Sequence, residues 1–177
     1  MQLEDARRLI EHKALHLYSP QVWVDLGCGS GVFTLALASL LPAESKIYAV
    51  DSNKALLNKI PAVYNNVTVE TFPLDFVESP FPFNKIDGVL MANSLHYVKD
   101  KAFFIHKIKN HLHDKHQILI VEYDTDKPVK TWVPYPLSFN SLKKLFEEAG
   151  YASVTKLHQR PSVFGSVMYS ALISSPS

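Results

Sequence analysis

The sequence predicts an α/β protein with a Rossmann-like, doubly wound and mostly parallel seven-stranded sheet that ends in an antiparallel C-terminal strand pair. Three observations carry this prediction. Five short apolar runs alternate with segments of helical periodicity up to residue 123. The first run leads into a glycine-rich turn over 25–31. Two more runs, at 152–158 and 166–173, then follow each other with no helical segment between them.

Length and composition limit the possible classes. A chain of 177 residues suits one domain with a substantial core, so we expect a single domain over 1–177. Eighteen basic and seventeen acidic residues leave a net charge of +1, which argues against nucleic acid as a partner unless a local basic patch exists. The single Cys28 excludes an internal disulfide and suits a reducing compartment. With no signal peptide and no apolar stretch of membrane-spanning length, we expect a cytoplasmic protein with no membrane partner.

The N-terminal half of the chain opens with an expected helix over 2–17, whose apolar residues recur at helical spacing. This helix should end near Ser19-Pro20 and form a partial cap on the domain. Three strands are then expected at 21–26, 46–51 and 67–71. The helices between them are expected at 31–41 and 53–60, and each is followed by a proline.

In the second half, a proline-rich loop over 73–84 leads to a strand at 86–91 and a helix at 99–113 in which we expect Phe103 to be buried. A fully apolar strand at 118–123 precedes an irregular segment over 124–137. A helix at 138–148 has Ser138 or Ser141 as its expected N-cap and Gly150 as its stop. The loop 159–165 should join the last two strands as a hairpin.

The turn over 25–31 is the most informative segment. An apolar run ends in Asp25, and Gly27, Gly29 and Gly31 then alternate with small residues before a helical pattern begins. Glycine allows backbone conformations closed to other residues and lets a ligand lie against the chain. A dinucleotide-binding fingerprint would need another glycine at the position of Val32. The spacing therefore disfavours a nucleotide-binding oxidoreductase.

The segment Asp25-Leu26-Gly27-Cys28-Gly29-Ser30-Gly31 resembles the first motif of class I S-adenosylmethionine (SAM)-dependent methyltransferases. Later segments keep the resemblance in order over nearly the whole chain. The stretch from Asn93 to Asp100 also resembles a family segment, although Tyr97 stands where a second histidine is usual. The likeness is to the broad type 11 group, which methylates quinone-like and other metabolites. It implies SAM as cofactor, S-adenosylhomocysteine (SAH) as product and a small molecule as acceptor.

The resemblance also implies roles for three acidic residues. Asp51 lies 20 residues after Gly31, and its carboxylate could accept two hydrogen bonds from the ribose hydroxyls. Asp75 could accept from the adenine amine while Phe76 packs near the ring, and Asp25 would order the turn near the methionine moiety. Purely structural roles remain alternatives: Asp51 could cap a helix and Asp25 a turn, while Asp75 could be an ordinary loop residue and Phe76 a core residue. The expected cofactor-binding residues are Asp25, Gly27, Cys28, Gly29, Gly31, Asp51, Ser52, Asp75, Phe76 and Asn93.

Methyl transfer needs alignment and exclusion of water, and it needs a base only when the acceptor must lose a proton. His96 is the candidate base, with packing or capping of the next helix as the alternative. Tyr97, Trp132 and Tyr135 are candidate substrate contacts, and Arg160 could anchor an anionic group. No metal site is expected: His111, His113 and His116 are predicted to lie on a solvated basic face.

The predicted function is therefore methyl transfer from SAM to a small-molecule acceptor. Two alternatives stay open. A protein of the same fold could bind SAM or a partner without turnover, or the acceptor could be RNA, held by the basic segment 99–116.

Overall fold

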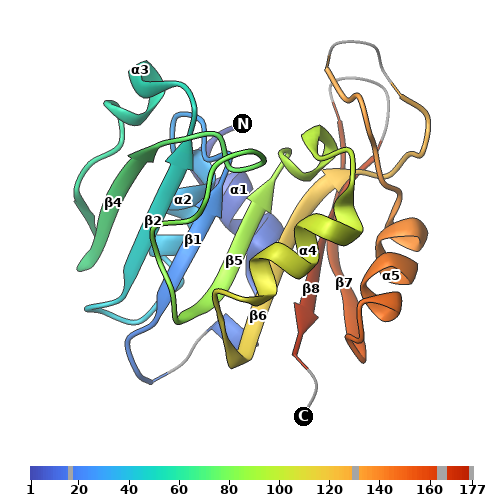
Figure 1. Cartoon of the computed structure of the whole chain (residues 1–177). Coiled ribbons are helices and arrows are strands. Elements are labelled where there is room, and N and C mark those ends of the chain that lie inside the picture. The colour runs from blue at the N-terminus through green and yellow to red at the C-terminus, as the bar shows by residue number, and fades with distance from the viewer. Residues whose placement is uncertain (16–17, 129–131, 163–166, 176–177) are drawn as a thin grey trace.

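The computed structural model describes residues 1–15, 18–128, 132–162 and 167–175. Its described strands form one sheet in the order β3-β4-β2-β1-β5-β6-β8-β7 (Figure 1). The strands are β1 Val22–Leu26, β2 Lys46–Asp51, β3 Val63–Tyr64, β4 Val67–Pro73, β5 Ile86–Ala92, β6 Leu112–Tyr123, β7 Ser153–Pro161 and β8 Val167–Ser174. The helices are α1 Leu3–Ile10, α2 Val32–Ala38, α3 Lys54–Leu57, α4 Lys101–Lys109 and α5 Phe139–Glu148, with 3-10 turns η1 Lys13–Leu15 and η2 Leu95–Tyr97.

The predicted fold class is confirmed. Strands β4, β2, β1, β5 and β6 are parallel, and β8 runs antiparallel between β6 and β7. The sheet has eight strands rather than seven because β3 pairs with the edge strand β4. A strand of two residues is too short to show an alternating pattern in the sequence.

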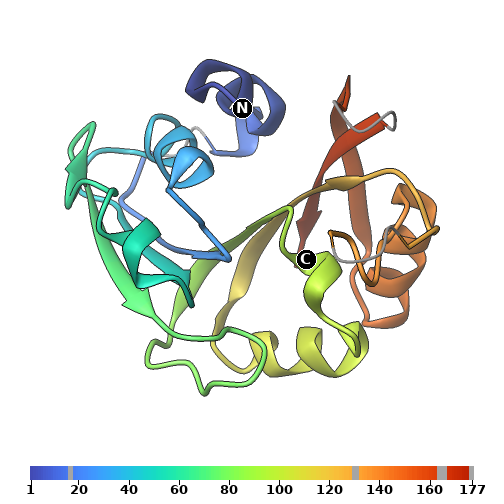
Figure 2. The ribbon, with the colours of Figure 1, turned by 90° about the horizontal axis from the view of Figure 1, so that it is seen from above.

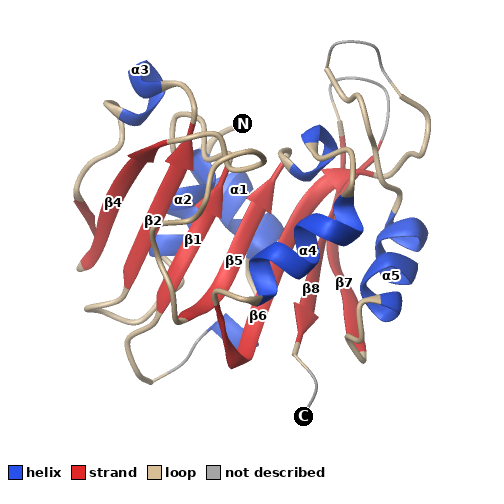
Figure 3. Cartoon of the chain, in the orientation of Figure 1, coloured by secondary structure: helices blue, strands red, loops and turns tan. Residues whose placement is uncertain are grey.

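Helices cover both faces of the sheet. Helices α1 and α2 lie on one face, and α4 and α5 lie on the other (Figures 2 and 3). Alternate residues of each central strand enter the two cores: Val24 packs with the α4 and α5 side, and Trp23 with the α1 and α2 side. This period of two follows from the strand geometry. It explains why the central strands are apolar on both faces.

Four predicted helices are shorter in the structure. Those expected at 31–41 and 53–60 are α2, Val32–Ala38, and α3, Lys54–Leu57. The N-terminal helix ends at Ile10 because Glu11 has extended backbone angles, and the separate turn η1 follows; residues 16–17 lie outside the described chain. Helix α4 ends at Lys109, and β6 already begins at Leu112. Phe103 on α4 is 68% exposed, so its expected burial is wrong. The expected N-cap of α5 is confirmed at Ser138, which accepts a hydrogen bond from the Ser141 amide.

The prediction of a solvated histidine face is wrong for His116. This residue lies in β6, is 8% exposed, and its Nε2 is 2.9 Å from the Tyr151 hydroxyl. Its Nδ1 is 2.6 Å from the His113 carbonyl oxygen. Burial lowers the pKa of His116.

No helix in the described ranges combines the length and apolar character needed to cross a bilayer.

Candidate cofactor-binding and active site

A cavity of about 480 Å³ lies at the carboxyl ends of β1, β2 and β5. These strand ends belong to the upper edge of the sheet in Figure 1. Ligands of open α/β sheets bind at this edge. Seven of the sequence-predicted site residues and three others form its lining, which is Gly27, Asp51, Ser52, Asp75, Phe76, Val77, Glu78, Asn93, Ser94 and Tyr97. The chain segments that the sequence singled out therefore meet in one place.

The glycine turn is tied to β2 by its backbone. The amides of Gly27 and Cys28 donate to the Val50 carbonyl oxygen at 2.8 and 3.0 Å. At Gly27, where φ is +80°, a Cβ atom would lie 2.5 Å from the Cβ of Ser94, so only glycine fits. At Gly29, φ is +55° and the space in front of the backbone is open within 4 Å. That open backbone is where a ligand can approach closely.

Asp51 joins the turn to the end of β2. Its Oδ2 accepts from the Gly29 amide at 2.9 Å, and its Oδ1 accepts from the Asn53 amide at 2.8 Å. The side-chain cap of α3 is Asn53, which accepts from Ala55. Each carboxylate oxygen has a further lone pair, so Asp51 can accept from a ligand while it holds the turn.

Asp25 lies beneath the turn and does not belong to the described cavity lining. It is fully buried, its Oδ2 accepts from the Thr34 hydroxyl at 2.6 Å, and its Oδ1 has no partner in the described chain. Burial raises the pKa of Asp25 to about 7, the Thr34 hydrogen bond opposes this, and the charge of Asp51 adds to it. Thr34 is a contact that the sequence did not reveal.

The segment after β4 forms the opposite wall. Asp75 Oδ1 accepts from the amides of Val77 at 2.8 Å and Glu78 at 3.4 Å. Phe76 is buried and meets Phe104 of α4 edge to face, with ring centroids 5.8 Å apart. Asp75 therefore keeps Oδ2 for a ligand, and Phe76 gives the cavity an apolar surface.

The end of β5 supplies two polar side chains. Asn93 has a φ of +55°, and its Oδ1 is buried without a hydrogen-bond partner among the described residues. A buried acceptor of this kind is costly unless a ligand or water satisfies it. Ser94 Oγ donates to the Leu26 carbonyl oxygen at 2.6 Å and so ties β5 to the turn.

His96 and Glu122 form a buried pair next to the cavity. His96 is 3% exposed and Glu122 is 1% exposed. The His96 amide donates to Glu122 Oε1 at 3.1 Å, and its ring Nδ1 lies 2.7 Å from Oε2. In the neutral tautomer that carries its proton on Nδ1, the ring would donate to Glu122 and leave the Nε2 lone pair free. His96 lies one residue before the cavity-lining Tyr97, and their ring centroids are 4.4 Å apart.

Three of the predicted substrate contacts, Tyr135, Trp132 and Arg160, do not line the cavity and lie in different places. The Tyr135 amide donates to the His96 carbonyl oxygen at 3.0 Å, so Tyr135 lies beside η2. Trp132 is 67% exposed and is not part of the described lining. Arg160 pairs with Asp5 at 3.3 Å in a separate depression between α1 and β7.

Cys28 directs its side chain away from the cavity. The side chain packs with Ala49, Leu57 and Ile60, and burial raises the pKa of its thiol well above the ordinary range. The thiol is therefore neutral and unsuited to nucleophilic chemistry. Any contact of Cys28 with a cofactor would come from its backbone.

The strand order, the glycine turn and the acid at the end of β2 define a class I SAM-dependent methyltransferase. Residues 24–115, more than half of the chain, match a family model described as a methyltransferase domain. The chain belongs to this methyltransferase domain family.

A curated relative is ribosomal RNA small subunit methyltransferase C of Buchnera aphidicola subsp. Baizongia pistaciae (strain Bp). It is 33% identical over 127 residues, which cover 68% of this chain and 38% of that protein. The chain therefore spans well under half the length of this relative.

Solved structures share the fold at low identity. A putative methyltransferase from Bacillus halodurans C-125 has a TM-score of 0.69 at 14% identity, with 98% of this chain and 100% of that chain covered. The plantazolicin methyltransferase BpumL, solved with a triazolic desmethylPZN analog and SAH, has a TM-score of 0.68 at 13% identity, with 97% and 84% covered. A SAM-dependent methyltransferase from Aquifex aeolicus has a TM-score of 0.60 at 17% identity, with 98% and 99% covered.

Proposed function

We propose that the chain binds SAM in the cavity above β1, β2 and β5 and transfers its methyl group to a small-molecule acceptor. The observation that carries this proposal is the meeting of the glycine turn, Asp51, Asp75 and Asn93 around one cavity of about 480 Å³. This volume lies in the usual range for small-molecule sites. The cavity is open enough for a ligand to enter and has polar groups from four separate chain segments.

The hydrogen-bond acceptors in the cavity fit the parts of SAM. Asp51 would accept from the ribose hydroxyls, and Asp75 would accept from the adenine amine through Oδ2. The bare backbone at Gly29 leaves room for the ligand, and the unpartnered Oδ1 of Asn93 can accept from an amine or hydroxyl. Asp25 would stabilise the turn from below and complement a positively charged group bound on it.

Bound SAM would supply a methyl group on a positively charged sulfur atom. The chain then has to align an acceptor with that methyl group and keep water away. Tyr97 lines the cavity, and Tyr135 lies beside the same turn η2. Both therefore remain proposed substrate contacts, together with Trp132 on the same segment as Tyr135. Arg160 is excluded from the proposal because its guanidinium pairs with Asp5 in a different depression.

His96 is the proposed proton acceptor for an acceptor that must lose a proton. Glu122 orients the ring through Nδ1 and would stabilise the imidazolium that forms when Nε2 takes the proton. The sequence did not identify Glu122, although an acid at the end of an apolar strand was its visible signal.

An RNA acceptor is the second candidate, because a curated relative is named as a ribosomal RNA methyltransferase. The balance of charge favours the small molecule. The net charge is +1, and three of the cavity-lining residues, Asp51, Asp75 and Glu78, are acidic. Acidic side chains in the cavity lining would repel a phosphate backbone.

Incubation with tritium-labelled SAM tests the proposal. We expect label to move from SAM into a different small molecule of a metabolite extract, separated from SAM by chromatography, and not into ribosomal RNA present in the same reaction. His96→Gln should lower kcat by about a hundredfold or more if the acceptor loses a proton, with the SAH dissociation constant unchanged.

The matched control for this variant is His106→Gln, on the exposed side of α4. Label in RNA would contradict a small-molecule acceptor and would support RNA as the acceptor. Binding of SAM without transfer to either fraction would favour a binding protein. An unchanged kcat in His96→Gln would leave His96 as a structural link between η2 and β6.

A further inference from the structure

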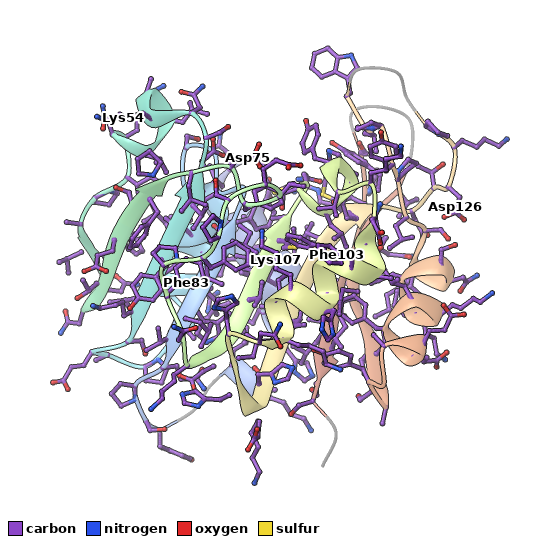
Figure 4. All side chains as sticks on the ribbon, viewed as in Figure 1. Lys54, Asp75, Phe83, Phe103, Lys107 and Asp126 are labelled. Atoms are coloured by element: carbon purple, nitrogen blue, oxygen red, sulfur yellow. The ribbon has the colours of Figure 1, made fainter. Side chains whose placement is uncertain are left out.

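Lys107 of α4 reaches across to the loop that carries Asp75 (Figure 4). Its Nζ donates to three backbone carbonyl oxygens: those of Phe76 at 3.2 Å, Val77 at 3.0 Å and Ser79 at 2.8 Å. An ammonium group has three N–H donors, so each donor has one carbonyl partner. The three acceptors lie within four residues of a segment that forms no regular helix or strand.

The five residues from Asp75 to Ser79 form a single turn. The Ser79 amide donates to the Asp75 carbonyl oxygen at 2.8 Å, and the Asp75 carboxylate accepts from the Val77 and Glu78 amides. Asp75 therefore satisfies the N–H groups of the turn. Lys107 satisfies its C=O groups, as a basic side chain does at the end of a helix. One turn is too short to be stable without such partners.

The surroundings of the Lys107 ammonium show that it is fixed rather than solvated. Nζ lies 4.5 Å from the centroid of the Phe81 ring, a favourable cation–π distance. Burial lowers the pKa of Lys107, and the carboxylates of Glu78 and Asp75 oppose that shift. Burying a charge costs free energy unless the charge is hydrogen-bonded, and the three carbonyl oxygens offset that cost here.

The turn held by Lys107 is one wall of the cavity. Asp75, Phe76, Val77 and Glu78 all line it, and Phe76 also approaches Gly27 of the opposite wall. Lys107 itself is not part of that lining. Its contacts with the cavity are therefore indirect and run through the backbone of the turn.

We propose that Lys107 is a positioning residue that fixes the Asp75–Ser79 turn so that Asp75 and Phe76 face the purine of the bound ligand. The inference rests on the proposed function, since it takes the ligand to be an adenosine derivative. Loss of the ammonium leaves three carbonyls without donors, and the turn relaxes. The purine end of the site is then lost, while the glycine turn and Asp51 are unchanged.

Calorimetric titration with SAH and with S-inosylhomocysteine tests this inference. The second compound has a carbonyl oxygen where adenine has its amine, so Asp75 can no longer accept from it. The wild-type chain should bind SAH about tenfold or more tightly than the inosine compound. Lys107→Met keeps the side-chain length but removes the donors, and it should weaken SAH binding about tenfold and reduce the preference between the two compounds to near one.

Lys109→Met is the matched control. Lys109 lies on the same helix, donates to the Ala149 carbonyl oxygen at 2.7 Å and packs over the Tyr151 ring, away from the cavity. It should lose comparable thermal stability while both dissociation constants stay within about twofold of the wild type. A role of Lys107 in general stability alone would lower Tm but leave the preference for SAH intact.

Lys107→Arg covers the case in which Lys107→Met does not fold. A guanidinium keeps the charge but is planar, so it cannot direct three N–H groups at three converging carbonyls. We expect a partial loss of preference and faster amide hydrogen exchange over residues 77–79. Wild-type preference in either folded Lys107 variant overturns the inference. Failure of the wild-type chain to bind SAH instead overturns the proposed function.

Discussion

At the scale of single residues, Asp25 couples folding to pH. Its carboxyl is protonated below about pH 4 in both the folded and the unfolded chain. Between the ordinary pKa of 3.8 and the folded pKa of about 7, the folded chain keeps a proton that the unfolded chain has released. Stability therefore falls as the pH rises through this range, by roughly 4 kcal/mol at most.

Urea unfolding between pH 4 and pH 8 measures this effect against Asp25→Asn, which has no charge to bury. The free energy of unfolding of the wild type minus that of the variant should fall with rising pH and level off above pH 7. Thr34→Val removes the hydrogen bond that opposes the shift, so it should extend the fall to higher pH. A difference in the free energy of unfolding that stays constant with pH would show that the folded chain does not raise the pKa of Asp25.

The sequence predicted correctly that the polar residues after the strand ends lie close together. Asp51, Asp75 and Asn93 could be placed together because the carboxyl ends of parallel strands share one edge of the sheet. The pairing of His96 with Glu122 could not be predicted in this way. It depends on how η2 packs on the end of β6, and the two residues are 26 positions apart in the sequence.

At the scale of secondary structure elements, the contact between β1 and β5 depends on one glycine. Trp23 is fully buried and pairs in register with Gly88, where a Cβ atom would lie 2.3 Å from the indole ring. Gly88→Ala should therefore lower the free energy of unfolding by about 1–3 kcal/mol. This loss of stability is measured by thermal unfolding of Gly88→Ala, Trp23→Leu and the double variant.

The double variant should be more stable than the sum of the single changes predicts, because the smaller leucine leaves room for the added methyl group. Additive losses would mean that the added methyl group at position 88 acts on something other than the indole.

The helices and strands that could be predicted are those whose apolar residues recur at a clear spacing. Apolar strands and capped helices were found, with ends displaced by a few residues. The start of β6 was missed because residues 112–116 are mostly polar and contain no β-branched side chain, so the histidines looked like part of the preceding helix. Burial of His116 against Tyr151 then follows from strand geometry that the sequence pattern does not contain.

At the scale of the whole molecule, the cavity joins segments that are far apart in the chain. Its lining runs from Gly27 to Tyr97, and the pair of His96 with Glu122 extends it to β6. A ligand that fills the cavity must therefore stabilise the native arrangement of several strands at once, and not only one loop.

This coupling predicts a shift of the unfolding temperature. SAH at about 100 times its dissociation constant, which we expect in the micromolar range, should add roughly 2.7 kcal/mol to the stability of the folded chain. For a domain of this size that corresponds to a rise in Tm of about 5–10 °C, measured by scanning calorimetry. Asp51→Ala should lose most of this rise at the same SAH concentration, because it removes the carboxylate that accepts from the Gly29 amide and faces the cavity. Asp114→Ala, an exposed acid on β6 outside the described lining, should keep the full rise. An equal rise in Asp51→Ala and the wild type would place the ribose of the ligand elsewhere on the sheet edge.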